Sequence, residues 1–315
     1  MTYAQNGLVQ ATDYNNLVTS YNTLWGVGSG SSGLGQTTLP TVSAYASIGS
    51  TEWKSLANGI TNLGIHQESV LATLPPYNVG DLVEYVAALQ TNLSTLTTNS
   101  GATGSQGTTE ITDTSSNSIW YDNMTITQTI AFPTADAARY FFNAGGQIVL
   151  LPTFIAGSNS IGSIFFSSLS KLCGTWVISG LGGKIVGSNY TPFTKIGGEN
   201  VSIPNYDTTL GYYGLSTSYQ QAVKIYSDGT IPGGTGYGNY GAGSYIQLNL
   251  MTNGTQGGNS DNGTIITAQT VFAEIPTGLP ITGTAKVSCI IKYPSNGYMV
   301  NTWNNVTVNG YVSGS

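Results

Sequence analysis

The chain has 315 residues, of which 40% are hydrophobic and only 7% charged, and its net charge is −6. This apolar and aromatic content is ample for a packed core and excludes a disordered chain. The eight basic residues, with Arg139 the single arginine, form no cluster that could neutralise nucleic-acid phosphates or an anionic membrane. No apolar run approaches the ~20 residues of a membrane span. The first residues also lack the pattern of a secretory signal.

The two cysteines, Cys173 and Cys289, are 116 positions apart in apolar stretches that resemble strands. Two cysteines in a chain of this length do not make a disulfide framework. We expect buried thiols, because an unbridged cysteine behaves as a small hydrophobic residue. The sequence leaves a bridge between them open.

Three helices are expected in residues 1–99, which we interpret as a helical region for attachment or oligomerisation. The first runs from Thr12 or Asp13 to Gly26 and has apolar residues at spacings of three and four, which place them on one stripe. The second begins after Ser50 with the same kind of pattern. The chain therefore opens with amphipathic helices that need a partner surface.

The third expected helix, residues 81–98, carries leucines and a valine at alternating spacings of four and three. This spacing is typical of a short coiled-coil seam. It fits either a core helix packed on the other two or a seam between protomers. The candidate contacts between subunits are Tyr14, Leu17, Tyr21, Trp25, Leu82, Val86, Leu89, Leu93 and Leu96.

A spacer rich in glycine, serine and threonine is expected over residues 100–117, with a β-rich body over 118–315. Alternating apolar and polar residues predict one long strand over 119–132. Further strands are expected at 147–154, 162–168, 174–179, 220–227, 244–251, 264–273, 283–292 and 298–312. Because turn dipeptides separate these strands and few helices interrupt them, the fold class is α+β, with a mainly antiparallel β-sandwich-like body.

Motifs for catalysis, metal binding and cofactor binding are absent from the sequence. The single histidine, His66, is expected to be exposed and without a catalytic role. Gly28, Gly30 and Gly33 match GxGxxG, but they follow a helix, whereas a dinucleotide-binding loop follows a strand. We therefore expect no enzyme, no catalytic residue, no metal and no cofactor. Glycan cleavage by two carboxylates is not eliminated, because it requires only a suitably spaced pair.

Residues 132–148 combine a strand end, a short helix capped by Thr134, and a glycine turn into another strand. Asp136 and Arg139 are three apart and can pair on the exposed side of this helix. The three aromatic residues that follow would anchor the helix on the sheet. We interpret the segment as a structural joint, with an interface hot spot as the alternative. The joint residues are Asp136, Arg139, Tyr140, Phe141, Phe142, Gly145 and Gly146.

Residues 138–148 (ARYFFNAGGQI) resemble a segment of virion structural proteins of tailed bacteriophages. Residues 11–18 followed by 21–26 resemble the opening of the same proteins, so the likeness, counted over the stretches 132–148 and 11–26, covers about 35 of the 315 residues. The resemblance implies a non-enzymatic component of the tail, neck or a fibre, present in several copies and assembled in the host cytoplasm. It brings no catalytic or ligand-binding residues with it.

The expected partners are further copies of the chain and other virion proteins, with no nucleic acid and no membrane insertion. The alternative is a receptor- or glycan-binding module, for which the tyrosine-rich tract 206–245 is the main support. A polysaccharide depolymerase and a bacterial surface-layer protein are further rivals. The low charge and the many small polar and aromatic residues suit a surface that packs against copies of itself.

Overall fold

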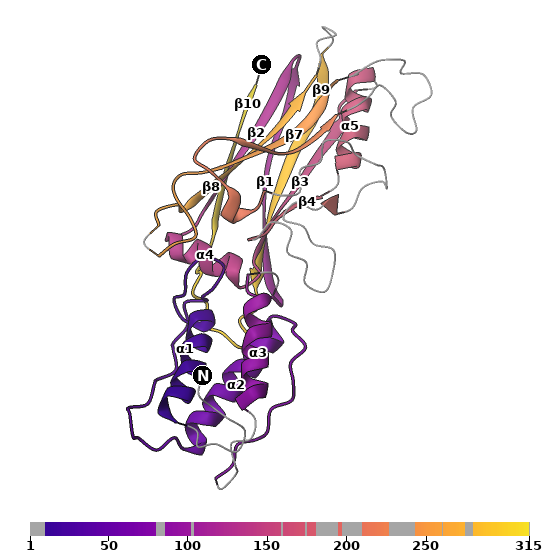
Figure 1. Ribbon diagram of the computed structural model, residues 1–315. Helices are drawn as coiled ribbons and strands as arrows, with labels where there is room; N and C mark the ends of the chain where they lie inside the picture. The colour runs from indigo at the N-terminus through magenta and orange to yellow at the C-terminus, as the bar shows by residue number, and fades with distance from the viewer. Residues whose placement is uncertain are drawn as a thin grey trace.

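The computed structural model shows an elongated molecule, with a helical bundle at one end and two β-sheets at the other (Figure 1). A short helix, α4 (Ala135–Asn143), lies between the two parts. The structure describes residues 10–79, 86–101, 104–158, 160–173, 175–180, 195–196, 210–226, 243–259, 261–274 and 280–314.

The bundle contains α1 (Ala11–Trp25), α2 (Ser50–His66) and α3 (Val86–Thr98), and each helix contacts the other two. Their apolar stripes meet in one core. In it, the ring of Tyr14 meets that of Trp53 edge-on, with centroids 5.1 Å apart. The expected helices are present within the described residues, and residues 81–85 lie outside them.

Asparagine side chains tie the long loops of the bundle to its helices. Asn15 donates to the carbonyl of Val42 and accepts from its N–H, both at 2.8 Å. Asn22 makes the same pair of bonds to Leu39, at 2.8 and 2.9 Å. Because each amide satisfies both polar groups of one loop residue, the 37–49 loop is held along α1 without regular structure of its own.

All strand pairs of the sheets are antiparallel, as the sequence predicts. One sheet has the order β1-β9-β3-β4-β5 and the other β10-β2-β8-β7-β6. The strands are β1 (Gln106–Trp120), β2 (Asn123–Ala131), β3 (Gln147–Ala156), β4 (Thr175–Ile178), β5 (Lys195–Ile196), β6 (Gln220–Tyr226), β7 (Tyr245–Thr252), β8 (Ile265–Ala273), β9 (Ile281–Pro294) and β10 (Thr307–Gly314).

The two sheets pack face to face over alternating apolar residues, such as Ile126 of β2 and Val287 of β9. The edge strands β1 and β10 contact each other and bring the sheets together on one side. On the other side, α5 (Ile161–Cys173) contacts β3 and β9 of the first sheet and β6 and β7 of the second. The body is therefore a β-sandwich with a helix wedged into one side.

Four expectations about the body are corrected. The spacer expected over 100–117 is largely strand, because β1 begins at Gln106 and its polar residues pair along β9. The strand expected over 119–132 is divided between β1 and β2, which belong to different sheets. The strand expected at 162–168 is part of α5. The strand expected over 298–312 begins only at Thr307.

Candidate functional site

The joint between bundle and sandwich is built around α4. Thr134 precedes the helix, and its Oγ1 accepts a hydrogen bond from the N–H of Ala137 at 3.0 Å. This cap satisfies one of the donors that a helix leaves open at its start. After the helix, Gly145 has a φ of 90°, a conformation that side chains disfavour, and the chain turns there into β3.

Aromatic rings hold α4 on the end of the sandwich. Phe142 stacks on Tyr212, with centroids 4.3 Å apart and planes at 17°. Phe141 meets Tyr293 edge-on at 6.0 Å, and both phenylalanines contact Phe132 at the end of β2. Tyr212 is therefore committed to packing in the joint, and so is not free to stack on a sugar as the glycan-binding alternative required. Tyr237 and Tyr240 of the same tract lie outside the described residues.

Arg139 points from α4 toward the bundle and is 1% exposed. Its Nη1 donates to the carbonyl of Ser32 at 3.1 Å, and its Nη2 donates to Asp136 and to Asn259, both at 3.0 Å. The expected pair of Asp136 and Arg139 is present, but only the carboxylate side chain, at 41%, is exposed. Arg139 itself is buried, and its guanidinium joins three segments of the chain, those that contain Ser32, Asp136 and Asn259.

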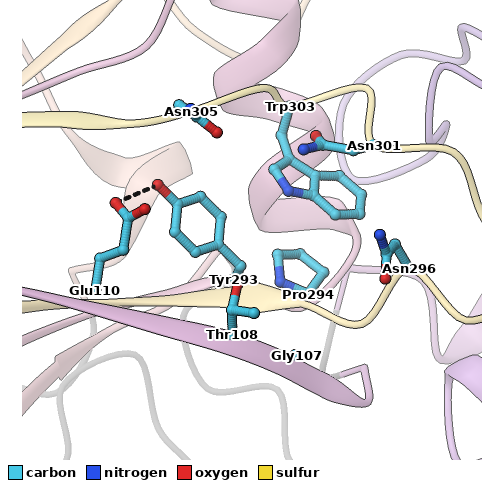
Figure 2. Close-up of a pocket in the computed structure, with 9 residues that line it drawn as sticks. All are labelled: Gly107, Thr108, Glu110, Tyr293, Pro294, Asn296, Asn301, Trp303 and Asn305. Atoms are coloured by element: carbon cyan, nitrogen blue, oxygen red, sulfur yellow. Dashed lines mark hydrogen bonds between the residues drawn. The ribbon is translucent and has the colours of Figure 1, made fainter.

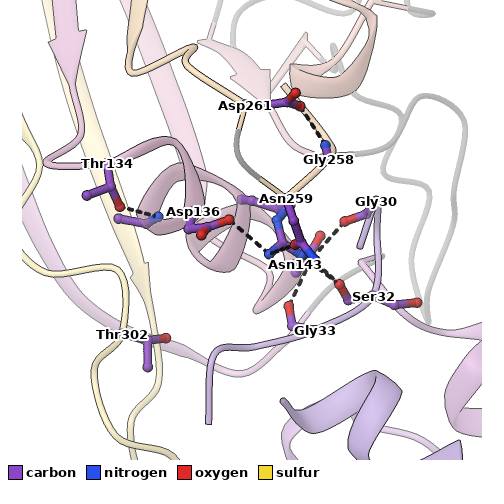
Figure 3. Close-up of polar contacts among 12 residues, drawn as sticks. Gly30, Ser32, Gly33, Thr134, Asp136, Asn143, Gly258, Asn259, Asp261 and Thr302 are labelled. Carbon is purple, nitrogen blue, oxygen red and sulfur yellow. Dashed lines mark hydrogen bonds and ion pairs between the residues drawn. The ribbon is translucent and has the colours of Figure 1, made fainter. Parts of the chain in front are cut away.

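A glycine-rich loop after α1 receives these contacts, as Figure 3 shows. The side-chain amide of Asn143 donates to the carbonyls of Gly30, Ser32 and Gly33 at 2.9 to 3.2 Å. The hydroxyl proton of Tyr213 is shared between the carbonyl oxygen of Gly30 and the side-chain oxygen of Asn143. Gly28, Gly30 and Gly33 have φ values of 54°, 59° and 93°. The GxGxxG match is therefore a turn that presents carbonyl oxygens to α4, whereas a phosphate would need N–H donors.

Two further polar contacts connect the bundle to the sandwich at the joint. Nε2 of His66, at the end of α2, lies 2.9 Å from the carbonyl oxygen of Ala144 after α4. His66 is buried, which corrects the expectation that it is exposed, and burial lowers its pKa although the bond to Ala144 opposes this. On the other side, Gln36 exchanges two 2.8 Å bonds with the backbone of Val300, in the loop between β9 and β10.

That loop, residues 295–306, also forms one wall of a cavity of about 220 Å³ beside the joint (Figure 2). The start of β1 and the end of β9 form its other walls. The floor includes Tyr293, whose hydroxyl donates to Oε2 of Glu110 at 3.0 Å and accepts from the N–H of Val306 at 3.0 Å. Burial raises the pKa of Tyr293 to about 12, so the hydroxyl stays protonated near neutral pH. The lining residues are Gly107, Thr108, Glu110, Tyr293, Pro294, Asn296, Asn301, Trp303 and Asn305.

The candidate contacts between subunits lie mostly inside the bundle core. Those that the structure buries are Tyr14, Leu17, Tyr21, Val86, Leu89, Leu93 and Leu96. Trp25 is partly buried against the same core, and Leu82 lies outside the described residues. The spacing of α3 is thus used for packing within one chain, and contact of these side chains with another subunit stays a prediction.

The two cysteines and the candidate metal ligands also have no chemical role that the structure shows in the described residues. Cys173 and Cys289 are buried thiols and no disulfide joins them, as expected. Burial raises the pKa of Cys289 to about 12. In the described part of the chain, no three His, Cys, Asp or Glu side chains gather as they would around a metal ion. None of the described helices has the length and apolar character needed to span a bilayer.

Comparisons with known proteins return no relative. No family model matches the chain, and neither a curated protein nor a solved structure does. The expectation that the chain is not an enzyme stays a prediction.

Proposed function

We propose that this protein is a structural component of a tailed-phage virion, present in multiple copies in the tail, neck or a fibre. One observation supports this most directly. The segments that resemble phage virion proteins, α1 with Gly26 and residues 138–148, are more than a hundred positions apart in the sequence, yet they meet at one joint. Arg139 and Asn143 bind the loop that directly follows α1. The resemblance thus falls on one structural unit.

The architecture suits a particle component with two ends. The bundle exposes large apolar side chains in its loops, among them Tyr45, Val70 and Val79. We expect these exposed loop side chains to contact a neighbouring subunit, because the apolar stripes of the helices are buried inside the bundle. The sandwich lies at the opposite end of the molecule and would form the displayed body (Figure 1). Its long edge strand β1 is polar and mostly exposed, which suits a solvated outer surface.

Immunogold electron microscopy of virions from the source lysate tests this proposal. The antibody would be raised against the purified full chain, and antibody absorbed with that chain is the control. We expect label at one repeated position on the particle. Label confined to the soluble lysate, with bare particles, would refute the proposal.

A further inference from the structure

The cavity between β1, the end of β9 and the 295–306 loop lies beside the joint, and Tyr293 belongs to both, because its ring also packs on Phe141. The loop has two faces. On one face, Val300 and Thr302 bind Gln36 and Leu34 of the bundle side. On the other face, Asn301 and Trp303 line the cavity. The loop is therefore held in place by contacts that leave the cavity open.

The cavity has an apolar floor and a polar rim. Tyr293 in its floor and Trp303 in the loop wall are buried, whereas Glu110, Asn296 and Asn305 are exposed around it. Small-molecule sites usually combine these features, with apolar walls and a few placed polar groups. The volume of about 220 Å³ is below the roughly 300–1,000 Å³ of sites for drug-sized ligands, which limits the occupant to about one ring.

Several hydrogen-bonding groups of this cavity have no partner within the described residues. The amides of Asn296 and Asn305 and the indole N–H of Trp303 are among them. Asn301 uses its oxygen to accept from the N–H of Asn304 at 2.7 Å and keeps its NH₂ available. Glu110 binds Tyr293 through one oxygen and keeps the other. An amide both donates and accepts, and a carboxylate only accepts.

We propose that this cavity binds a single neutral sugar ring. Vicinal hydroxyls both donate and accept, as the amides, the indole N–H of Trp303 and the carboxylate of Glu110 require. Glu110 is the one charged residue among the nine described lining residues, so an anionic sugar is disfavoured. A hard divalent cation needs six to eight oxygen ligands, which one carboxylate and the rim amides do not supply. The inference does not rest on the proposed place in a virion.

Saturation-transfer NMR and isothermal titration with the purified full chain test this inference. The panel is glucose, galactose, mannose and N-acetylglucosamine, with glucuronic acid as the anionic ring and sorbitol as the open-chain polyol. We expect saturable binding of at least one neutral sugar, with a dissociation constant on the order of 1 mM for so small a ligand. Glucuronic acid and sorbitol should bind at least fivefold more weakly.

Three variants locate the site. Glu110→Gln keeps an acceptor for Tyr293, and Asn305→Ala removes an exposed amide, so both should fold normally. Each should weaken binding about tenfold. Asn117→Ala removes an equally exposed amide further along β1, away from the cavity, and should leave binding unchanged. The inference is overturned if no neutral sugar saturates below about 50 mM, or if neither cavity variant weakens binding. Neither result depends on where the protein lies on a particle.

Discussion

The core of the bundle and the joint between bundle and sandwich are held together by different kinds of contact. In the bundle, leucines such as Leu56 and Leu89 are fully buried against other apolar side chains. In the joint, Arg139 and Asn143 donate to backbone carbonyls of the 30–33 loop. Apolar burial is non-directional, whereas hydrogen bonds weaken steeply with misalignment. The core therefore stabilises the bundle, and the joint sets its orientation against the sandwich.

Replacing the buried arginine is the largest test of this difference. Arg139→Met keeps much of the side-chain volume but removes bonds to Ser32, Asp136 and Asn259. Hydrogen bonds from a buried charged group are lost together with an ion pair whose carboxylate is exposed, so we expect a loss of about 3 kcal/mol in unfolding free energy. Hydrogen exchange should rise in the 26–36 loop before it rises in the bundle core. Urea denaturation and exchange mass spectrometry measure the two effects.

The matched control is the exposed ion pair of the sandwich, Lys286 with Asp113 at 3.2 Å. Lys286→Met should change stability by no more than about 0.5 kcal/mol, because exposed pairs contribute little. Equal losses for the two variants would contradict the special role of the joint. Faster hydrogen exchange throughout the bundle in the Arg139→Met variant would contradict it as well.

Glycines of the 28–35 loop provide a second, smaller test. At Gly33, φ is 93° and an added Cβ would collide with the carbonyl oxygen of Val27, so Gly33→Ala should cost about 2 kcal/mol or more. At Gly30, φ is 59° but the nearest atom to such a Cβ is 4.0 Å away. Gly30→Ala should therefore cost only about 1 kcal/mol. Thermal unfolding of both variants gives the comparison, and a larger loss at Gly30 would be evidence against this loop geometry.

The same contrast explains what the sequence could predict. Periodic apolar residues indicate α1, α2 and most strands, because each buries one face. The strand β1 has polar residues on both faces and is ordered by its ladder with β9, so no local pattern indicates it. The sequence does not distinguish the helix α5 from a strand, because its apolar residues Ile164, Phe165 and Phe166 are consecutive and fit either structure.

The joint was only half predictable for a related reason. Asp136 lies one helical turn from Arg139, so their pairing follows from spacing. Ser32 and Asn259 are 107 and 120 positions away from Arg139, and only the fold brings them to it. The sequence does not indicate the burial of His66, because its partner, Ala144, contributes a backbone carbonyl that no side-chain pattern reveals.

The smallest expected effect is a pH dependence of stability that comes from His66, a residue of the joint. Burial lowers the pKa of His66 below its ordinary value of 6.5 in the folded state, with Ala144 and Glu68 opposing this. The unfolded chain therefore binds a proton first as the pH falls. The contribution of His66 to stability is complete above about pH 6.5 and is lost progressively toward its folded-state pKa.

The variant His66→Gln isolates this effect, because it removes the titrating group but keeps an N–H that can donate to Ala144. Between pH 7.5 and pH 5, the urea midpoint of unfolding should fall further for the natural chain than for the variant. Carboxylate titration lowers both midpoints equally, so the difference reports His66. Exchange at Ser105, whose N–H donates to the carbonyl of His66 at 2.8 Å, should rise with the same pH dependence. If the two chains lose equal stability between these pH values, His66 is not held neutral in the joint. The polar contacts would then set the orientation of the bundle without making it sensitive to pH.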